Sequence, residues 1–219
     1  MRKLEARLLQ DLRSRGYHYE RDMPIEDCLA IANLLGKPVG DVRNPEPVRF
    51  ITPQGTTIAK ANTLSSRYGL GEFPFHTDAA YWQVPPELIL FCSVSAGSGK
   101  RPTLLVDPRQ WRLSESERRA LYNEVWKVIG RKPFLCTVAT EDGGDMRLRF
   151  DEACMVPVTV GAHSVHVRVK ACIEESCVEV VNWREGDLLI VDNCRLLHAR
   201  GRAEQDDEDR ILARVLIRR

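Results

Sequence analysis

The chain has 219 residues, of which 43% are hydrophobic and 29% charged, and this composition is typical of one globular domain that buries a core. Its 32 basic and 31 acidic residues leave a net charge of +1, which argues against nucleic acid or a membrane surface as a partner. No apolar run approaches the roughly 18 residues that cross a bilayer, and the charged N-terminus differs from a signal peptide, so we expect a cytoplasmic protein.

The seven cysteines are odd in number and form no C-x-x-C pair. In a chain without a secretion signal, this usage predicts reduced thiols rather than a disulfide framework or a cysteine-bound zinc. The cysteines stand at positions 28, 92, 136, 154, 172, 177 and 194.

Two helices are predicted at the start of the chain, over 3–15 and 25–35, because apolar residues recur there at helical spacing. A third helix is predicted over 114–129, where Ser114 and Glu117 have the spacing of a capping box. Short apolar runs broken by Pro, Gly, Asn and Asp predict strands elsewhere. The candidate strands are 48–52, 56–60, 87–95, 103–107, 133–139, 146–151, 164–169, 187–192 and 210–218.

This order of elements predicts a mainly β protein with flanking helices, in which the strands form a closed or sandwiched barrel. We expect a single domain over residues 1–219, with a helical N-terminal part, residues 1–40, packed on the barrel. No internal repeat, low-complexity tract or linker divides the chain.

The stretch FPFHTDAAYW, residues 73–82, contains a His-x-Asp triplet. Residues two apart in an extended segment project to the same side, about 6–7 Å apart, so His76 and Asp78 could close on one metal ion. A lone triplet of this kind is more often a capped turn. A metal site therefore needs a third ligand from elsewhere in the chain.

His198 is the best candidate for that ligand, because it follows a buried strand in WREGDLLIVDNCRLLHARG, residues 183–201. Two histidines and one carboxylate on one face of an ion form the facial triad of non-haem Fe(II) oxygenases, with open positions for a co-substrate and O₂. The same ligand set also suits a catalytic zinc ion. Ligand chemistry alone leaves both metals open.

The last segment, DRILARVLIRR, alternates strictly between two faces. Arg210 and Arg214 fall on the same face, about 13 Å apart along the strand. Arginine grips a carboxylate through two parallel hydrogen bonds. A surface strand with its basic face in water is the alternative, but the leucines between the arginines and the nearness of His198 favour an inward basic face.

The sequence resembles the TauD/TfdA-like (taurine dioxygenase/clavaminate synthase-like) family of Fe(II)/2-oxoglutarate-dependent dioxygenases. The resemblance rests on FHTDAAY at 75–81, PTLLVD at 102–107, and VDNCRLLHARG at 191–201 followed by DRILAR. It implies a double-stranded β-helix, the jelly-roll or cupin-like fold. It also implies that His76, Asp78 and His198 bind Fe(II).

The same resemblance implies that Arg210 binds the distal carboxylate of 2-oxoglutarate, with help from the hydroxyl group of Thr103. Arg214 would lie deeper, near the proximal carboxylate or an anionic group of the substrate. Because Asp78 stands where halogenating members have a small residue, the resemblance implies hydroxylation or desaturation rather than halogenation.

The expected activity is therefore oxidation of a small polar, amino-acid-derived molecule by Fe(II), 2-oxoglutarate and O₂, with release of succinate and CO₂. Two alternatives remain: a zinc hydrolase that uses the same three ligands, and a non-catalytic jelly-roll module that binds a small acid or a protein. Indifference to Arg210 would favour the hydrolase. Unchanged ligand binding by a His198→Ala variant would favour the binding module.

Five residues are candidates for substrate contact. Tyr81 follows the triplet and could line a pocket, although core packing is an equal alternative. Asn62 and Ser65 precede the triplet on a segment that could cover the site. Arg149 could reach an acidic substrate, although a solvated strand face is the favoured interpretation, and Arg214 completes the set.

Overall fold

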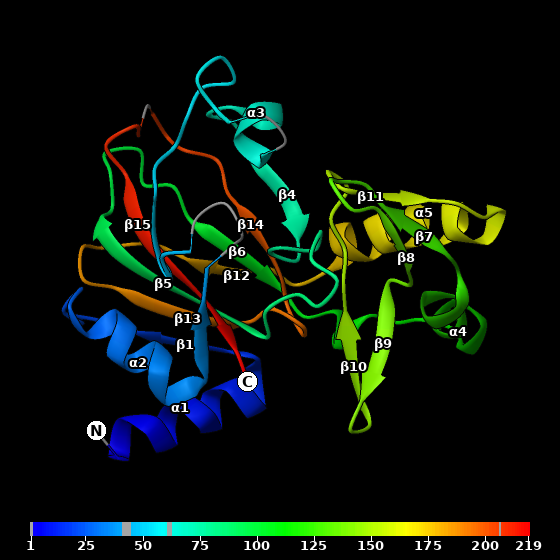
Figure 1. Cartoon of the computed structure of the whole chain (residues 1–219), viewed down its shortest axis with the longest axis horizontal. Helices are drawn as coiled ribbons and strands as arrows, with labels where there is room; N and C mark the ends of the chain where they lie inside the picture. The colour runs from blue at the N-terminus through cyan, green and yellow to red at the C-terminus, as the bar shows by residue number, and fades with distance from the viewer. Residues whose placement is uncertain (1, 41–44, 61–62, 206) are drawn as a thin grey trace.

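Two antiparallel sheets form the body of the protein in a computed structural model that describes residues 2–40, 45–60, 63–205 and 207–219 (Figure 1). In spatial order, the six-stranded sheet consists of β1 (Tyr17–Glu20), β13 (Leu188–Asp192), β5 (Leu88–Ser95), β15 (Ile211–Arg218) and β2 (Lys37–Val39), with β3 (Val48–Ile51) also pairing with β15. The four-stranded sheet consists of β12 (Glu179–Val181), β6 (Thr103–Val106), β14 (Leu197–Arg200) and β4 (Phe73–His76).

The two sheets share one hydrophobic core. Ile89 and Leu189 from the six-stranded sheet join Leu105 and Val181 from the four-stranded sheet in a single buried cluster. Burial of side chains from both inner faces is what holds stacked sheets together. The prediction of a mainly β protein with flanking helices is confirmed.

Two helices cover the outer face of the six-stranded sheet, as Figure 1 shows. In α1 (Arg2–Arg15), Leu8 and Leu12 are buried, and in α2 (Asp27–Leu35) so is Ile31, all in one cluster with Leu90 of the sheet. The helices predicted over 3–15 and 25–35 are confirmed. The N-terminal segment is not only helical, because β1 and β2 also belong to it.

The alternation predicted for the last strand is confirmed. Leu212 and Leu216 of β15 belong to the cluster between the two sheets. Ala213, Val215 and Ile217 belong to the cluster under the helices. The face that carries Arg210 and Arg214 therefore points into the molecule.

A second lobe is inserted between β6 and β12 and lies beside the two-sheet body (Figure 1). It consists of η1 (Pro108–Gln110), α4 (Glu115–Asn123), β7 (Trp126–Val128), β8 (Phe134–Cys136), β9 (Ala139–Asp142), β10 (Asp145–Leu148), β11 (Met155–Pro157) and α5 (Val160–Glu175). Trp126 and Phe150 are central to its core, which also includes Ala80, Val106 and Leu197 of the body. The lobe and the body thus share buried apolar surface.

Three expected elements differ from the structure. Residues 56–60 form turns rather than a strand, and residues 164–169 lie within α5. The helix that begins after Ser114 has the predicted capping box with Glu117 but ends at Asn123 instead of 129, because the chain there turns into β7. Between the turns and β4 lies one further short helix, α3 (Leu64–Tyr68).

All seven cysteines are free, in agreement with the prediction of reduced thiols. Within the described ranges, no helix is both long and apolar enough to cross a bilayer.

Candidate metal and anion site

His76 and His198 lie directly opposite each other on neighbouring strands. They are paired residues in the antiparallel register of β4 and β14, and their ring centroids are 4.3 Å apart. Each residue is only 6% exposed. The structure therefore brings together two histidines that stand 122 positions apart in the sequence, and His198 itself lies within the short strand β14.

Hydrogen bonding and burial leave a ring nitrogen of each histidine available to a metal ion. Nδ1 of His76 donates to the carbonyl oxygen of Pro74 at 2.9 Å, so the lone pair of His76 resides on Nε2. Burial, followed by the neighbouring His76, lowers the pKa of His198 to about 3. Nδ1 of His198 is buried and has no hydrogen-bond partner among the described residues. A buried polar atom of this kind is expected where a ligand or ion is bound.

Asp78 lies on a tightly held turn just after β4. Its backbone N–H donates to Oδ1 of Asn193 at 2.8 Å, and Nδ2 of Asn193 donates to the Asp78 carbonyl oxygen at 3.0 Å. The next residue, Ala79, has a positive φ of 54°, a conformation that is rare outside glycine and is concentrated at functional sites. The backbone around Asp78 is therefore fixed from both sides.

The carboxylate of Asp78 is held by Arg214. Its Oδ2 accepts from Nη1 of Arg214 at 2.7 Å, and its Oδ1 accepts from the Ala79 N–H at 3.0 Å. Burial raises the pKa of Asp78, but the charges of Arg214 and of the two histidines outweigh it, so the pKa lies below its ordinary value. Asp78 is therefore an anion beside His76 and His198.

Oδ2 of Asp78 is bonded to Arg214. His76, Asp78 and His198 therefore do not surround one metal position as they stand. No three His, Cys, Asp or Glu side chains in the described part of the chain are arranged to hold a metal ion as they stand. The donor set still suits a metal ion, since two imidazoles that are register partners on β4 and β14 lie beside an ionised carboxylate two residues after His76. What separates the observed arrangement from a metal site is the orientation of the Asp78 side chain.

Arg210, which directly precedes β15, forms a second basic centre. It is 5% exposed, and its guanidinium carbon lies 5.9 Å from the ring centre of Trp183. Trp183 in turn donates from Nε1 to Oγ1 of Thr103 at 3.0 Å. The indole therefore connects the two residues for which the sequence predicted a shared role, and Trp183 itself was not predicted.

The buried carboxylate that lies close to Arg210, Asp207, is already in use. Asp207 accepts from Nε and Nη2 of Arg101 at 2.6 and 2.8 Å, and this ion pair is almost fully buried. Burial lowers the pKa of Arg210 to about 10, and Nε of Arg210 is buried with no partner among the residues described. A buried cation with an open donor suits an anionic ligand.

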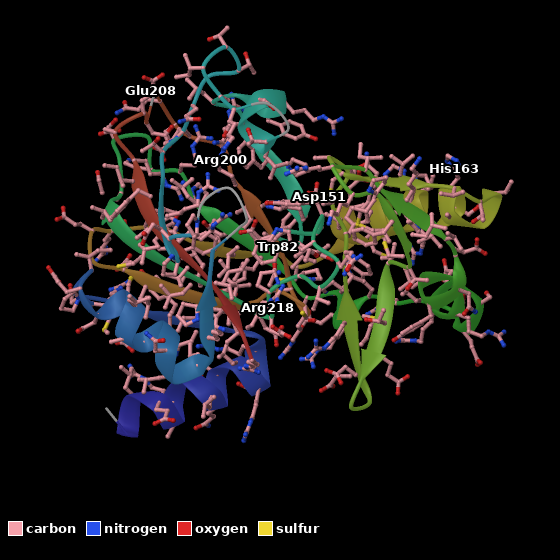
Figure 2. The ribbon with its side chains drawn as sticks, in the orientation of Figure 1. Trp82, Asp151, His163, Arg200, Glu208 and Arg218 are labelled. Carbon is pink, nitrogen blue, oxygen red and sulfur yellow. The ribbon has the colours of Figure 1, made fainter. Side chains whose placement is uncertain are left out.

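Thr77 lies between His76 and Asp78 and connects the end of β4 to the inserted lobe. Its N–H donates to the Phe150 carbonyl oxygen at 2.7 Å, and its Oγ1 accepts from the Phe150 N–H at 3.1 Å. This contact places Asp151, which is 7% exposed, next to β4, as Figure 2 shows. Nothing in the sequence points to Asp151 beyond its acidic side chain.

The remaining substrate candidates are more scattered. Ser65 lies on α3, and Tyr81 is 51% exposed with its ring edge-on to Trp82. Arg149 is not on a solvated strand face, because its Nη2 donates to the Gln83 carbonyl oxygen at 2.7 Å. Asn62 lies outside the described residues.

The other three histidines have separate surroundings. His18 pairs with Asp11, and His166 pairs with Glu152. His163 lies exposed on α5, far from the two-sheet body in Figure 2.

Only the comparison with solved structures gives matches for this chain. No family model and no curated protein matches the sequence. An asparagine oxygenase in complex with Fe(II), (2S,3S)-3-hydroxyasparagine and succinate superposes with a TM-score of 0.83, at 20% identity over 99% of this chain and 79% of the other. The chain has the fold of an iron oxygenase.

A second solved structure supports the same conclusion. The non-haem iron oxygenase OrfP in complex with Fe and α-ketoglutaric acid superposes with a TM-score of 0.77, at 18% identity over 100% of this chain and 80% of the other. At this identity the likeness establishes the fold, while the activity has to be argued from the site.

Proposed function

We propose that this protein is an Fe(II)- and 2-oxoglutarate-dependent oxygenase that hydroxylates or desaturates a small polar, amino-acid-derived molecule. Its two sheets would then be the halves of a double-stranded β-helix, in a single domain over residues 1–219. Two solved structures of the same fold contain iron together with succinate or α-ketoglutaric acid. One of them is named as an oxygenase of asparagine, which supports an amino acid as substrate.

His76, Asp78 and His198 would hold the iron. The two histidines would supply two nitrogen donors, and the ionised Asp78 would supply an oxygen donor. Zinc would accept the same donors, but the arginines nearby favour a site that also binds an anion. For the iron to bind, Asp78 must exchange its bond with Arg214 for a bond with the metal.

Arg210 and Thr103 would bind the distal carboxylate of 2-oxoglutarate. Both are buried and both lie against Trp183: Thr103 accepts a hydrogen bond from the indole N–H, and the Arg210 guanidinium lies over the indole ring. A buried guanidinium whose nearby carboxylate belongs to Arg101 offers its donors to a carboxylate from outside. The carboxylate would gain charge-assisted hydrogen bonds in a site with little water.

Iron and 2-oxoglutarate would supply the oxidising chemistry, with O₂ consumed and succinate and CO₂ released. The protein's own residues would supply position and shielding. The shared core of the two sheets and the inserted lobe surrounds the histidines with apolar side chains, which excludes water from the site.

One observation carries the proposal: His76 and His198 are register partners on adjacent strands, with Asp78 two residues further on and an inward basic face on β15. Neither a capped turn nor a surface strand explains this combination. An arrangement of two imidazoles, an ionised carboxylate and two inward arginines matches the needs of a metal and an anionic co-substrate bound side by side.

The test is an anaerobic titration of metal-free protein with Fe(II) and then 2-oxoglutarate, followed by visible absorption. We expect a weak metal-to-ligand charge-transfer band in the wild type and none in His76→Ala. The matched control is His163→Ala, which removes an exposed histidine from α5 and should retain the full band.

The rival functions correspond to other outcomes. Folded, metal-bound protein without the band would overturn the oxygenase and favour a zinc hydrolase that is active without 2-oxoglutarate. A His198→Ala variant that folds and binds its ligand unchanged would favour a non-catalytic binding module.

A further inference from the structure

The strand that carries His76 contains a β-bulge. His198 of β14 pairs with His76 of β4. The next pair is Arg200 with Phe73, two residues further along β14 but three residues back along β4. The extra residue of β4 therefore lies between Phe73 and His76, where Pro74 has no N–H to donate to the ladder. Bulges of this kind are common beside active sites, where they redirect a side chain.

The bulge determines how His76 is presented to a metal ion. The Pro74 carbonyl oxygen accepts from Nδ1 of His76 at 2.9 Å, which leaves Nε2 of the ring for the metal. Without the bulge, regular pairing from Phe73 onward would bring Phe75 opposite His198. His76 would then project from the other face of the strand. The two histidines can share one ion only if the bulge stays in its place.

Arg200 contacts the chain immediately before the bulge. Its guanidinium carbon lies 3.4 Å from the centre of the Phe73 ring. Its Nε donates to the Gly71 carbonyl oxygen at 3.0 Å, and its Nη2 donates to the carbonyl oxygens of Gly69 and Gly71. One side chain of β14 therefore fixes both Phe73 and the segment that leads into β4.

The charge of Arg200 is not paired with a carboxylate of its own. Its hydrogen bonds within the described part of the chain all go to carbonyl oxygens, and the nearby Asp207 is bonded to Arg101. Burial, together with the charges of Arg101 and Arg210, lowers the pKa of Arg200 to about 9. A half-buried cation of this kind costs stability. Such a cost is typical of residues that serve a functional site.

We propose that Arg200 is a positioning residue, which fixes the bulge of β4 and thereby keeps His76 opposite His198 for metal binding. The proposal rests on the metal site of the oxygenase proposed above. Arg200 acts through the strand, not through contact with the metal. Arg101 supports the same segment, because its guanidinium donates to the carbonyl oxygens of Leu70 and Gly71.

The first test needs no metal. Protein with ¹⁵N-labelled histidine is compared by NMR with its Arg200→Met variant, which keeps the length of the side chain but loses the donors. We expect a protected ring N–H signal for His76, because its Nδ1–H is bonded to the Pro74 carbonyl oxygen. This signal should be lost in the variant. The signal of His18, a buried ring bonded to a carboxylate elsewhere, should remain as an internal control.

The second test uses Co(II), whose visible spectrum reports its ligands without turnover. Arg200→Met should bind Co(II) roughly 10- to 100-fold more weakly, with a spectrum that approaches that of His76→Ala. Arg200→Lys, which keeps the charge, should restore part of the affinity. The matched control is Arg202→Met, which changes an exposed arginine two residues further on and should bind Co(II) like the wild type.

Thermal melting separates positioning from stability. The charge that Arg200→Met removes has no carboxylate partner of its own, so the metal-free variant should melt within about 3 °C of the wild type. A structural role would instead lower the melting temperature and the Co(II) affinity together.

Three results would overturn the positioning role: an unchanged His76 signal, weaker Co(II) binding that accompanies a large fall in melting temperature, or loss of 2-oxoglutarate binding with an unchanged Co(II) spectrum. Failure of the proposed function has a different signature. In that case the wild type and His76→Ala would bind Co(II) equally, whereas loss of the His76 signal in Arg200→Met would still demonstrate control of the bulge.

Discussion

Arg210 and Arg214, the two inward arginines of the last segment, differ in their anionic partners. At one end, Arg210 is almost fully buried beside Trp183, and Asp207 nearby is already paired with Arg101. At the other end, Arg214 is bound to Asp78 inside the protein. The first end is thus prepared for an anion from outside, while the second holds an internal anion that a metal also needs.

This difference shows that two arginines of similar appearance in the sequence have opposite effects on ligand binding. Arg210 should assist its ligand directly. Arg214 should compete with the metal for Asp78 until a substrate carboxylate takes over one or more of its donors. Substitutions at the two ends should therefore change different binding constants, and in different directions.

The largest effect is expected for Arg210→Gln. It removes the charge that would hold 2-oxoglutarate, so we expect the dissociation constant for 2-oxoglutarate to rise about 100-fold, which corresponds to two charge-assisted hydrogen bonds. Calorimetry on the Mn(II)-loaded protein measures it. The matched control, Arg218→Gln, changes an exposed arginine on the same strand and should bind 2-oxoglutarate normally. An unchanged constant in Arg210→Gln would contradict the assignment of Arg210.

An intermediate effect of opposite sign is expected for Arg214→Gln. This change frees the Asp78 carboxylate and removes a positive charge from the metal site, so Mn(II) should bind about tenfold more tightly. Electron paramagnetic resonance of free Mn(II) during a titration measures the constant. Arg210→Gln serves as the comparison and should leave metal affinity unchanged. Weaker metal binding in Arg214→Gln would mean that Arg214 orients Asp78 rather than competes for it.

The smallest effect is expected for Thr103→Val. Removal of the hydroxyl group would take away one hydrogen bond to the distal carboxylate of 2-oxoglutarate and leaves Nε1 of Trp183 without its acceptor. We expect roughly fivefold weaker 2-oxoglutarate binding and a loss of about 1–2 kcal/mol in the free energy of unfolding. Urea unfolding followed by tryptophan fluorescence measures the second quantity. Thr103→Ser keeps the hydroxyl group and should recover both.

Much of this arrangement was predictable where chemistry and periodicity agree. Alternation on the last strand predicted the inward arginines, and the scarcity of histidines limited the choice of metal ligands. Periodicity failed in α5, because Val165, Val167 and Val169 alternate as in a strand. In the helix, Val165 and Val169 are buried while Val167 is 70% exposed, a pattern that also fits the helical repeat.

The contacts that depend on strand pairing could not be predicted from the sequence. Arg49 stands in the four-residue strand VRFI, and nothing in that segment states that it pairs with Arg214. Trp183 and Asn193 act through hydrogen bonds to residues far away in the chain. Register and long-range hydrogen bonds arise from the packing of the whole fold, so local patterns do not encode them.

The hydrogen bonds between the Asn193 side chain and the Asp78 backbone affect how quickly the metal site can assemble. Because its side chain holds the backbone of Asp78 on both sides, the carboxylate can move from Arg214 to a metal by rotation about its own side-chain bonds. Rotation of a side chain is faster than the rearrangement of a loop, which takes about nanoseconds to microseconds, or of a domain, which takes about microseconds to milliseconds. Metal uptake should therefore follow a single, diffusion-controlled phase, with no slow step that reports refolding of the turn.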